Sequence, residues 1–214
     1  MAQRSRFCPA NVPVHVVQRG NNQQACFTCG QDISAYIHWL SEGAQKYRVA
    51  VHGWVFMTNH LHLLLTPSDD TGLSKLMQYL GRQYVRSFNG RYNRSGTLFQ
   101  ARFRSCLVQD TEYLLNCLRY IELNPVRAGI TTRPDDYHWS SYHSHAYGIE
   151  AAMQTYHDLY LSLGKTSTER QQVYRDLVQT QLDTDAIARI RRCTNTGLPF
   201  GSQQFQQQIK DIRS

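Results

Sequence analysis

Apolar residues recur along roughly the first 125 residues with two spacings, one typical of strands and one typical of helices. Short β-branched or alternating runs bounded by turn residues predict strands, and apolar residues spaced three and four apart predict amphipathic helices. The predicted strands are residues 12–19, 50–57, 61–65 and 98–108. The predicted helices are residues 32–48 behind Asp32 as N-cap, residues 73–84, and residues 110–121 behind Asp110 as N-cap, with Pro125 as the stop.

The order of these elements predicts the fold class. Strand, helix, strand, strand, helix, strand is the order of a ferredoxin-like unit with an antiparallel sheet, so we expect an α+β protein. After about residue 150 the chain becomes helical and polar, and it ends in a glutamine-rich stretch. We therefore expect one α+β domain over residues 1–150 and a helical C-terminal extension over residues 151–214.

Composition excludes several classes of protein. Among the 214 residues, 41% are hydrophobic and 11% aromatic, which excludes a disordered or fibrous chain. No run approaches the roughly 18 apolar residues of a membrane span, and the first residues lack the apolar segment of a signal peptide. The six cysteines are scattered, and Cys26 and Cys29 form a single CxxC pair without a second pair to complete a zinc site. A reducing, cytoplasmic location without a membrane partner is therefore expected.

The net charge of +7 is concentrated in residues 1–110, which hold 12 basic and 5 acidic side chains. Such a basic half indicates a polyanionic partner or ordinary solubility charge. Residues 81–105 carry arginines interleaved with aromatic residues and have no acidic residue, whereas a merely solvated face usually mixes signs. Arginines that hold phosphates and aromatic rings that stack on bases are typical of nucleic-acid binding. These arginines are Arg82, Arg86, Arg91, Arg94, Arg102 and Arg104.

Two histidines alternate with leucines in one predicted strand. Side chains at i and i+2 share a face, so His60 and His62 point one way and the flanking leucines point the other way. Two neutral imidazoles side by side suit a divalent metal. A chance match in a chain with nine histidines is the alternative, and a third ligand is missing from this strand.

The predicted helix before Pro125 offers the missing ligand. At about 100° per residue, Tyr120 and Asn124 lie one turn apart on a shared flank of the apolar stripe. A tyrosine hydroxyl and an amide oxygen so placed could act as nucleophile and metal ligand. The alternatives are an ordinary flank residue and a helix-terminal cap, and Glu122, on a different helical face, is a second candidate ligand.

These residues stand in a longer pattern that resembles the single-tyrosine HUH transposases, and among them the REP-associated tyrosine transposases. The similarity covers nearly the whole chain, and the ordered pair of histidine and tyrosine motifs is highly specific. The matching segments are QRGN (18–21), TNHLHLLL (58–65), GTLFQARF (96–103), RYIELNPVRAG (119–129), WSSY (139–142) and GLPFGS (197–202).

The resemblance implies an enzyme of DNA transposition and recombination whose catalytic domain is residues 1–150. His60, His62 and Asn124 would bind Mg²⁺ or Mn²⁺, and Tyr120 would attack single-stranded hairpin DNA to form a 5′-phosphotyrosine link. A phenol is a weak nucleophile at neutral pH, so metal activation of the phosphate makes chemical sense. The expected partner is a REP-like DNA hairpin, and two assembly states stay open, a monomer or, as in related insertion-sequence enzymes, a homodimer. Further expected DNA contacts are Arg19, Asn21, Arg119 and Arg127.

Two other functions remain open at this point. One is a DNA-binding protein on the same scaffold that has lost its activity, and the other is a metal-dependent hydrolase in which Tyr120 is only structural. The remaining histidines are expected to be structural or exposed. The basic cluster of Arg189, Arg191 and Arg192 in the C-terminal extension is an open candidate for contact with DNA or a partner.

Overall fold

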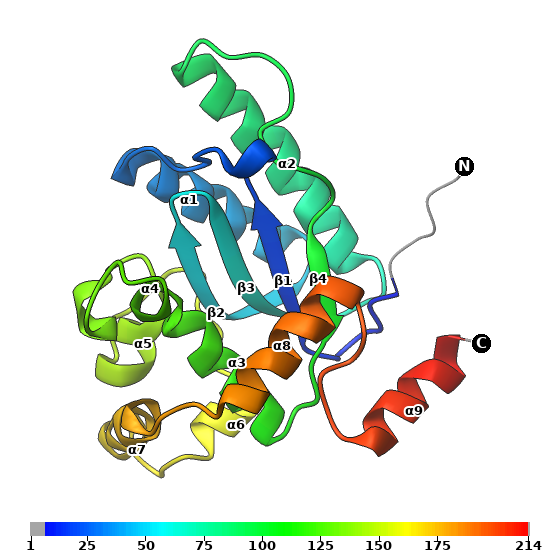
Figure 1. Ribbon diagram of the computed structural model, residues 1–214, viewed down its shortest axis with the longest axis vertical. Helices are drawn as coiled ribbons and strands as arrows, with labels where there is room; N and C mark the ends of the chain where they lie inside the picture. The colour runs from blue at the N-terminus through cyan, green and yellow to red at the C-terminus, as the bar shows by residue number, and fades with distance from the viewer. Residues whose placement is uncertain (1–6, 214) are drawn as a thin grey trace.

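Four strands form one antiparallel sheet in the computed structural model, which describes residues 7–213. The strand order is β2-β3-β1-β4 (Figure 1), and each hydrogen-bonded pair of strands is antiparallel. The strands are β1 (Val14–Arg19), β2 (Val49–Met57), β3 (His60–Pro67) and β4 (Arg104–Leu107). With one helix between β1 and β2 and another between β3 and β4, this is the ferredoxin-like α+β order, and the predicted fold class is confirmed.

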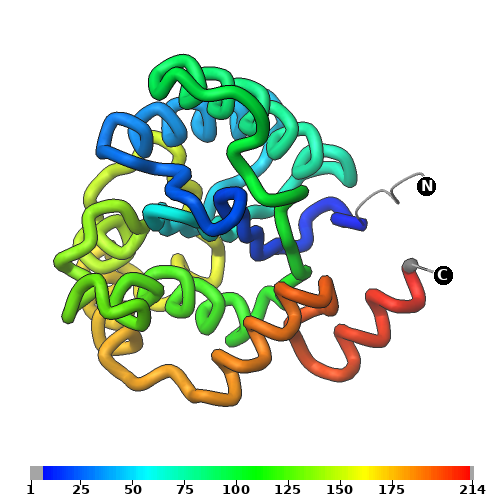
Figure 2. The backbone as a smooth tube through the Cα atoms, turned by 45° about the horizontal axis from the view of Figure 1, so that its top comes forward, coloured from blue at the N-terminus to red at the C-terminus, as the bar shows by residue number. Residues whose placement is uncertain are grey.

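Helices cover both faces of the sheet (Figure 2). α1 (Gly30–Lys46) and α2 (Gly72–Arg91) pack on one face, and α3 (Glu112–Glu122) and α8 (Thr184–Thr196) pack on the other. Alternation along β3 supplies both cores, because Leu63 packs toward α1 and α2 while Leu64 packs on the side of α3. The sheet is thus buried on both faces, and polar residues beneath α3 and α8 are enclosed.

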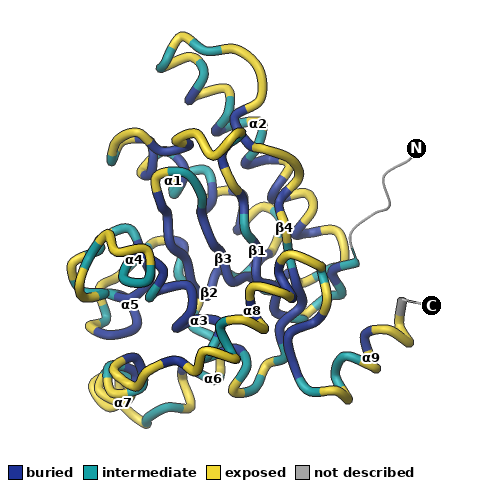
Figure 3. Tube along the Cα trace, in the orientation of Figure 1, coloured by how far each residue is buried: buried dark blue, intermediate teal, exposed yellow. Residues whose placement is uncertain are grey.

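Shorter elements complete the chain around this sandwich. They are η1 (Asn21–Gln23), α4 (Asn124–Arg127), η2 (Pro134–Asp136), α5 (Tyr142–Tyr147), α6 (Asp158–Leu161), α7 (Ser167–Gln179) and α9 (Gln203–Arg213). α5 and α7 contribute to the core beside α3, whereas α9 stands at the edge with much of its surface exposed (Figure 3). No helix in the described part of the chain has the length and apolarity to cross a membrane.

Both predicted N-caps are wrong, although both helices exist. Cys29 is the N-cap of α1, and the carboxylate of Asp32, three residues later in the first turn, accepts hydrogen bonds from the backbone N–H of Thr28 and of Cys29. Thr111 rather than Asp110 precedes the first residue of α3. Apolar periodicity defines a helix but leaves its ends uncertain by a residue or more, and an acidic residue near the start fits several positions of the first turn.

The predicted strand over residues 98–108 is also too long. Regular pairing with β1 is limited to β4, from Arg104 to Leu107, and an isolated bridge joins Gly20 to Phe99. Phe99 and Phe103 are buried as isolated side chains of a loop. An apolar run of this kind therefore does not require a continuous row of β-sheet hydrogen bonds. This loop leads past the ends of β1 and β3, which places its arginines next to the site described below.

Candidate active site

The sheet register places the predicted metal ligands on the face covered by α3 and α8. In the antiparallel pairing of β1 with β3, Arg19 lies opposite His60 and Val17 lies opposite His62. Directly opposite residues point to the same side of a sheet. The leucines that alternate with these histidines are buried on the other side, as the spacing predicts.

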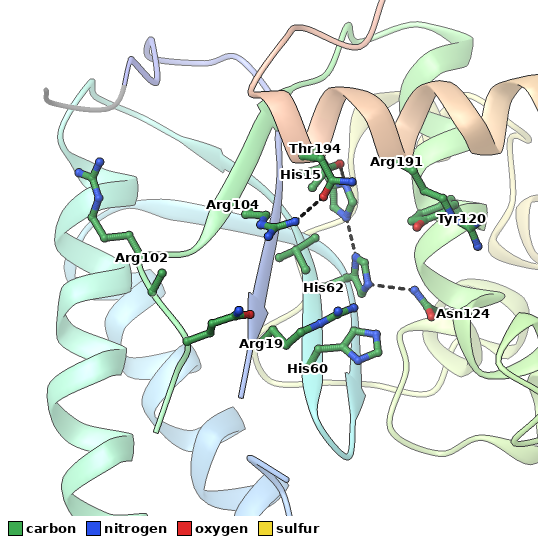
Figure 4. A pocket seen from close by; sticks show the side chains of 14 residues that line it. His15, Arg19, His60, His62, Arg102, Arg104, Tyr120, Asn124, Arg191 and Thr194 are labelled. Atoms are coloured by element: carbon green, nitrogen blue, oxygen red, sulfur yellow. Dashed lines mark hydrogen bonds between the residues drawn. The ribbon is translucent and has the colours of Figure 1, made fainter. Parts of the chain in front are cut away.

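A cavity of about 600 Å³ opens on this face, and all four predicted chemical residues line it (Figure 4). His60 and His62 come from β3, Tyr120 from α3 and Asn124 from α4. The Asn124 side-chain nitrogen lies 2.9 Å from Nε2 of His62, and the ring centroids of His62 and Tyr120 are 5.9 Å apart. Residues separated by about 60 positions in the chain therefore meet in one small space.

The local geometry around Pro125 brings Asn124 to the histidines. α3 ends at Glu122, and Pro125 lies in the first turn of the short helix α4. Proline is tolerated there because the first N–H groups of a helix have no partner inside it. One helix thus ends and another begins between Tyr120 and Asn124, and both side chains still line the same cavity.

Both histidines are held in the neutral state that a metal ligand requires. Burial lowers the pKa of His60 to about 4, with Arg19 adding to the effect, and burial holds the pKa of His62 well below its ordinary value. Nδ1 of His60 donates to Oδ1 of Asn59 at 2.7 Å, so in the neutral ring Nε2 is the unprotonated nitrogen.

The donor set fits a hard or borderline divalent ion. Nowhere in residues 7–213 do three His, Cys, Asp or Glu side chains gather in a ligand cluster, so a third side-chain donor at this site would be of another type. Asn124 provides one beside His62, and its side-chain oxygen is a ligand type that Mg²⁺ and Mn²⁺ accept alongside imidazole. The residues present therefore fit such an ion.

The rim of the cavity is strongly basic. Arg19, Arg102 and Arg104 of the predicted DNA-binding set line it, and Arg191 of α8 lies beside Tyr120 (Figure 4). Nη1 of Arg104 donates to the side chain of Asn195 at 2.6 Å. None of the described residues that line this cavity is acidic, so its electrostatic field favours an anion.

The remaining predicted DNA contacts lie outside the cavity lining. Arg82 and Arg86 are exposed on α2, and Arg91 forms an ion pair with Asp32 at 2.9 Å that joins α2 to α1. Arg94 packs over the ring of Phe88, and Asn21 lies in η1 at the end of β1.

Arg119 and Arg127 are engaged inside the protein. Arg119 is buried and donates to the Thr180 carbonyl, which ties α3 to the segment before α8. The guanidinium of Arg127 lies over the ring of Tyr120, 4.1 Å from its centroid. The structure therefore gives both side chains contacts within the chain itself.

Glu122 is not among the residues that line the cavity. It is fully buried, and its carboxylate accepts hydrogen bonds from Ser141, from Nδ1 of His145 and from the hydroxyl of Tyr174. This network links α3 with α5 and α7. It supports the helix that carries Tyr120 without entering the cavity.

Sequence reasoning missed two buried residues behind the histidines. His15 in β1 was expected to be structural or exposed, and it hydrogen-bonds His62 with 2.8 Å between Nε2 and Nδ1. Thr194 in α8 hydrogen-bonds His15 in turn, at 3.0 Å. The even spacing of His15 and Arg19 puts both side chains on one face of the predicted strand, and this pattern could have indicated that His15 faces the site. The contact with Thr194 spans 179 residues and had no such pattern.

Comparison with known proteins identifies the family of this chain. Residues 8–124 match the family model described as "Transposase IS200 like". A Haemophilus influenzae protein described as a REP-associated tyrosine transposase is 34% identical over 123 residues, which cover 49% of this chain and 69% of the relative. The fold is similar to a solved REP-associated tyrosine transposase bound to a REP hairpin, with a TM-score of 0.59 and 18% identity over 72% of this chain and 92% of that one. The chain belongs to the IS200-like transposase family, and to its REP-associated tyrosine transposases.

Proposed function

We propose that this protein cleaves and rejoins single-stranded hairpin DNA through a covalent bond to Tyr120. The observation that carries the proposal is the single cavity shared by Tyr120, His60, His62 and Asn124 beneath a basic rim. Nucleophile, candidate ligands and phosphate-binding groups come from one chain, so a homodimer is not needed to complete the site. A REP-like hairpin is the proposed substrate because the similar solved protein is bound to one.

His60, His62 and Asn124 would hold the ion, with the imidazole Nε2 atoms and the amide oxygen as donors. When bound, Mg²⁺ or Mn²⁺ supplies Lewis-acid polarisation of the scissile phosphate, worth several kcal/mol of transition-state stabilisation. Arg19, Arg102 and Arg104 would bind the neighbouring phosphates and hold the strand against the cavity.

In the cleavage step, Oη of Tyr120 forms a bond to phosphorus while the bond from phosphorus to the 3′-oxygen breaks. The phenolic proton ends on the leaving 3′-oxygen, so the products are a 5′-phosphotyrosine and a 3′-hydroxyl. Attack by a 3′-hydroxyl on the phosphotyrosine reverses the step and rejoins DNA. No bond energy is lost to water, and no nucleotide cofactor is required.

The direct test uses stem–loop oligonucleotides with single-stranded flanks, incubated with the full chain and Mn²⁺. A 3′-labelled strand should become covalently attached to the protein, whereas a 5′-labelled strand should be released with a 3′-hydroxyl. Tyr120→Phe should bind the hairpin and form no adduct. Tyr113→Phe, on the same helix and packed on Phe200, is the matched control and should cleave normally.

The outcomes separate the rival functions. Hairpin binding without cleavage across a panel of REP-like stems would indicate a DNA-binding protein without activity. Cleavage that persists in Tyr120→Phe would indicate a hydrolase and would overturn the proposed nucleophile.

A further inference from the structure

A row of buried hydrogen bonds runs from His62 along the face of the sheet that α8 covers and ends in α8 itself (Figure 4). Nδ1 of His62 lies 2.8 Å from Nε2 of His15, and Nδ1 of His15 lies 3.0 Å from Oγ1 of Thr194. Oγ1 of Thr194 lies 2.8 Å from the backbone oxygen of Ile190, one turn earlier in α8. All three side chains are buried, and a hydrogen bond is electrostatically stronger in such an environment than at an exposed site.

The last bond in the row sets the direction of the others. A carbonyl oxygen only accepts, so the single hydroxyl proton of Thr194 points at Ile190. The Thr194 oxygen then accepts from Nδ1–H of His15, whose Nε2 carries a lone pair when the ring is neutral. The His15 side chain is fully buried, and none of the described residues that line the cavity beside it is acidic, so no carboxylate is present there to pair with a doubly protonated ring.

The same logic extends to the cavity. Because Nε2 of His15 accepts, Nδ1 of His62 must donate, and Nε2 of His62 is left unprotonated toward Asn124. The opposite direction would turn the Thr194 proton toward His15. Two buried oxygen atoms would then face each other at 2.8 Å without a proton between them.

We infer that His15 and Thr194 are positioning residues that hold His62 in the tautomer with its lone pair at Nε2, so that helix α8 is a working part of the metal site. The inference rests on the proposed function only in taking Nε2 of His62 as a metal ligand. Partners behind a ligating histidine fix its tautomer and ring orientation, and their loss typically weakens metal binding by 10- to 100-fold.

The second ligand provides an internal comparison. His60 is oriented by Asn59, whose own side-chain nitrogen donates to the backbone oxygen of Gln23. That anchor is local to one end of the sheet and does not involve α8. A change at Thr194 should therefore alter His62 and leave His60 as it was.

The test combines two measurements on the full, metal-free chain, without DNA. Long-range ¹⁵N NMR reports which ring nitrogen of each histidine carries the proton, and titration calorimetry with MnCl₂ reports metal affinity. The variants are Thr194→Val, which removes the hydroxyl at constant shape, Thr194→Ser, which restores it, and His15→Phe, which keeps a ring without nitrogen. Thr196→Val is the matched control, because its hydroxyl bonds one turn back in α8 on an exposed face.

We expect His62 protonated at Nδ1 and bare at Nε2 in the unaltered protein. Thr194→Val and His15→Phe should bind Mn²⁺ 10- to 100-fold more weakly, with Thr194→Ser within about threefold of the unaltered protein. Thr196→Val should bind normally. Thr194→Val should also change the His62 spectrum and spare that of His60, which a general loss of packing would not do.

Two results would overturn the inference while leaving the proposed function intact. One is a His62 protonated at Nε2 in the unaltered protein, and the other is a folded Thr194→Val with normal Mn²⁺ affinity. If the unaltered protein and His62→Ala both fail to bind Mn²⁺, the proposed metal site fails instead. The tautomer spectrum would then still decide whether Thr194 directs the protons.

Discussion

The guanidinium of Arg127 lies 4.1 Å from the ring centroid of Tyr120 and donates a hydrogen bond of 2.7 Å to the Tyr120 backbone oxygen. One side chain therefore holds both the ring and the main chain of the proposed nucleophile. A stacked cation of this kind is worth about 0.5–2 kcal/mol. Arg127 is thus suited to fix the angle at which the phenol enters the cavity.

Arg127→Lys should lower the rate constant of hairpin cleavage about tenfold, equivalent to about 1.4 kcal/mol, because an ammonium group lacks the planar surface that stacks on the ring. Hairpin affinity should stay within about twofold. Arg175→Lys is the control, because Arg175 stacks on Tyr147 and caps the Ala146 carbonyl away from the cavity. Lost affinity at an unchanged rate would make Arg127 a DNA contact instead.

Glu122→Gln should lower the free energy of unfolding by about 3 kcal/mol, because an amide cannot accept from all the donors that surround this fully buried carboxylate. Urea denaturation provides the measurement. Glu112→Gln in the exposed first turn of the same helix should cost less than about 1 kcal/mol. Equal effects of the two substitutions would show that the network contributes nothing to stability.

Stability should fall as the solution is acidified from pH 6.5 to pH 4, and His52 contributes to that fall. Burial lowers its pKa from 6.5 to about 4, so in this range the unfolded chain binds a proton that the native protein does not. Each such group contributes up to about 1.4 kcal/mol per pH unit. His52→Gln, which can still pair with Thr155 and Thr66, should show a shallower slope below pH 6.5 and a parallel curve above pH 7. An unchanged slope would contradict this assignment.

Arg102→Asn should weaken hairpin binding and reduce the slope of log affinity against log salt concentration by about 0.7, the value for one phosphate contact on a single strand. Arg48→Asn is the matched control. Arg48 is exposed at the opposite end of the β2–β3 pair, and its left-handed backbone suits asparagine. If both variants bind alike, the cavity rim is not the DNA-binding surface.

The sequence predicts most of the fold because the relevant signals are local. The alternation in residues 61–65 and the helical stripe ending at Ile121 can each be recognised within a single segment of the sequence. Both predicted elements are present in the structure. The helix starts at Asp32 and Asp110 were wrong because one acidic residue fits several positions of a first turn. The strand before residue 104 was wrong because isolated buried rings resemble an apolar ladder.

The candidate site divides in the same way. The meeting of His62 and Tyr120 follows from motifs that stand in order along the chain. Hydrogen bonds between distant elements have no such pattern. In the sequence, Thr194 has no feature that separates it from other residues of a polar helix. The packing of α8 on β1 and β4 brings its hydroxyl to His15.

Synthesis on the ribosome gives these long-range contacts an order in time. The histidine strand and the rim arginines emerge early, the tyrosine follows, and the hydroxyl that pairs with His15 comes 179 residues after it. A growing chain can thus complete its sheet and present its basic surface while α8 is still unmade. A chain that stops short of α8 would keep Arg19, Arg102 and Arg104 but lack the hydroxyl that pairs with His15.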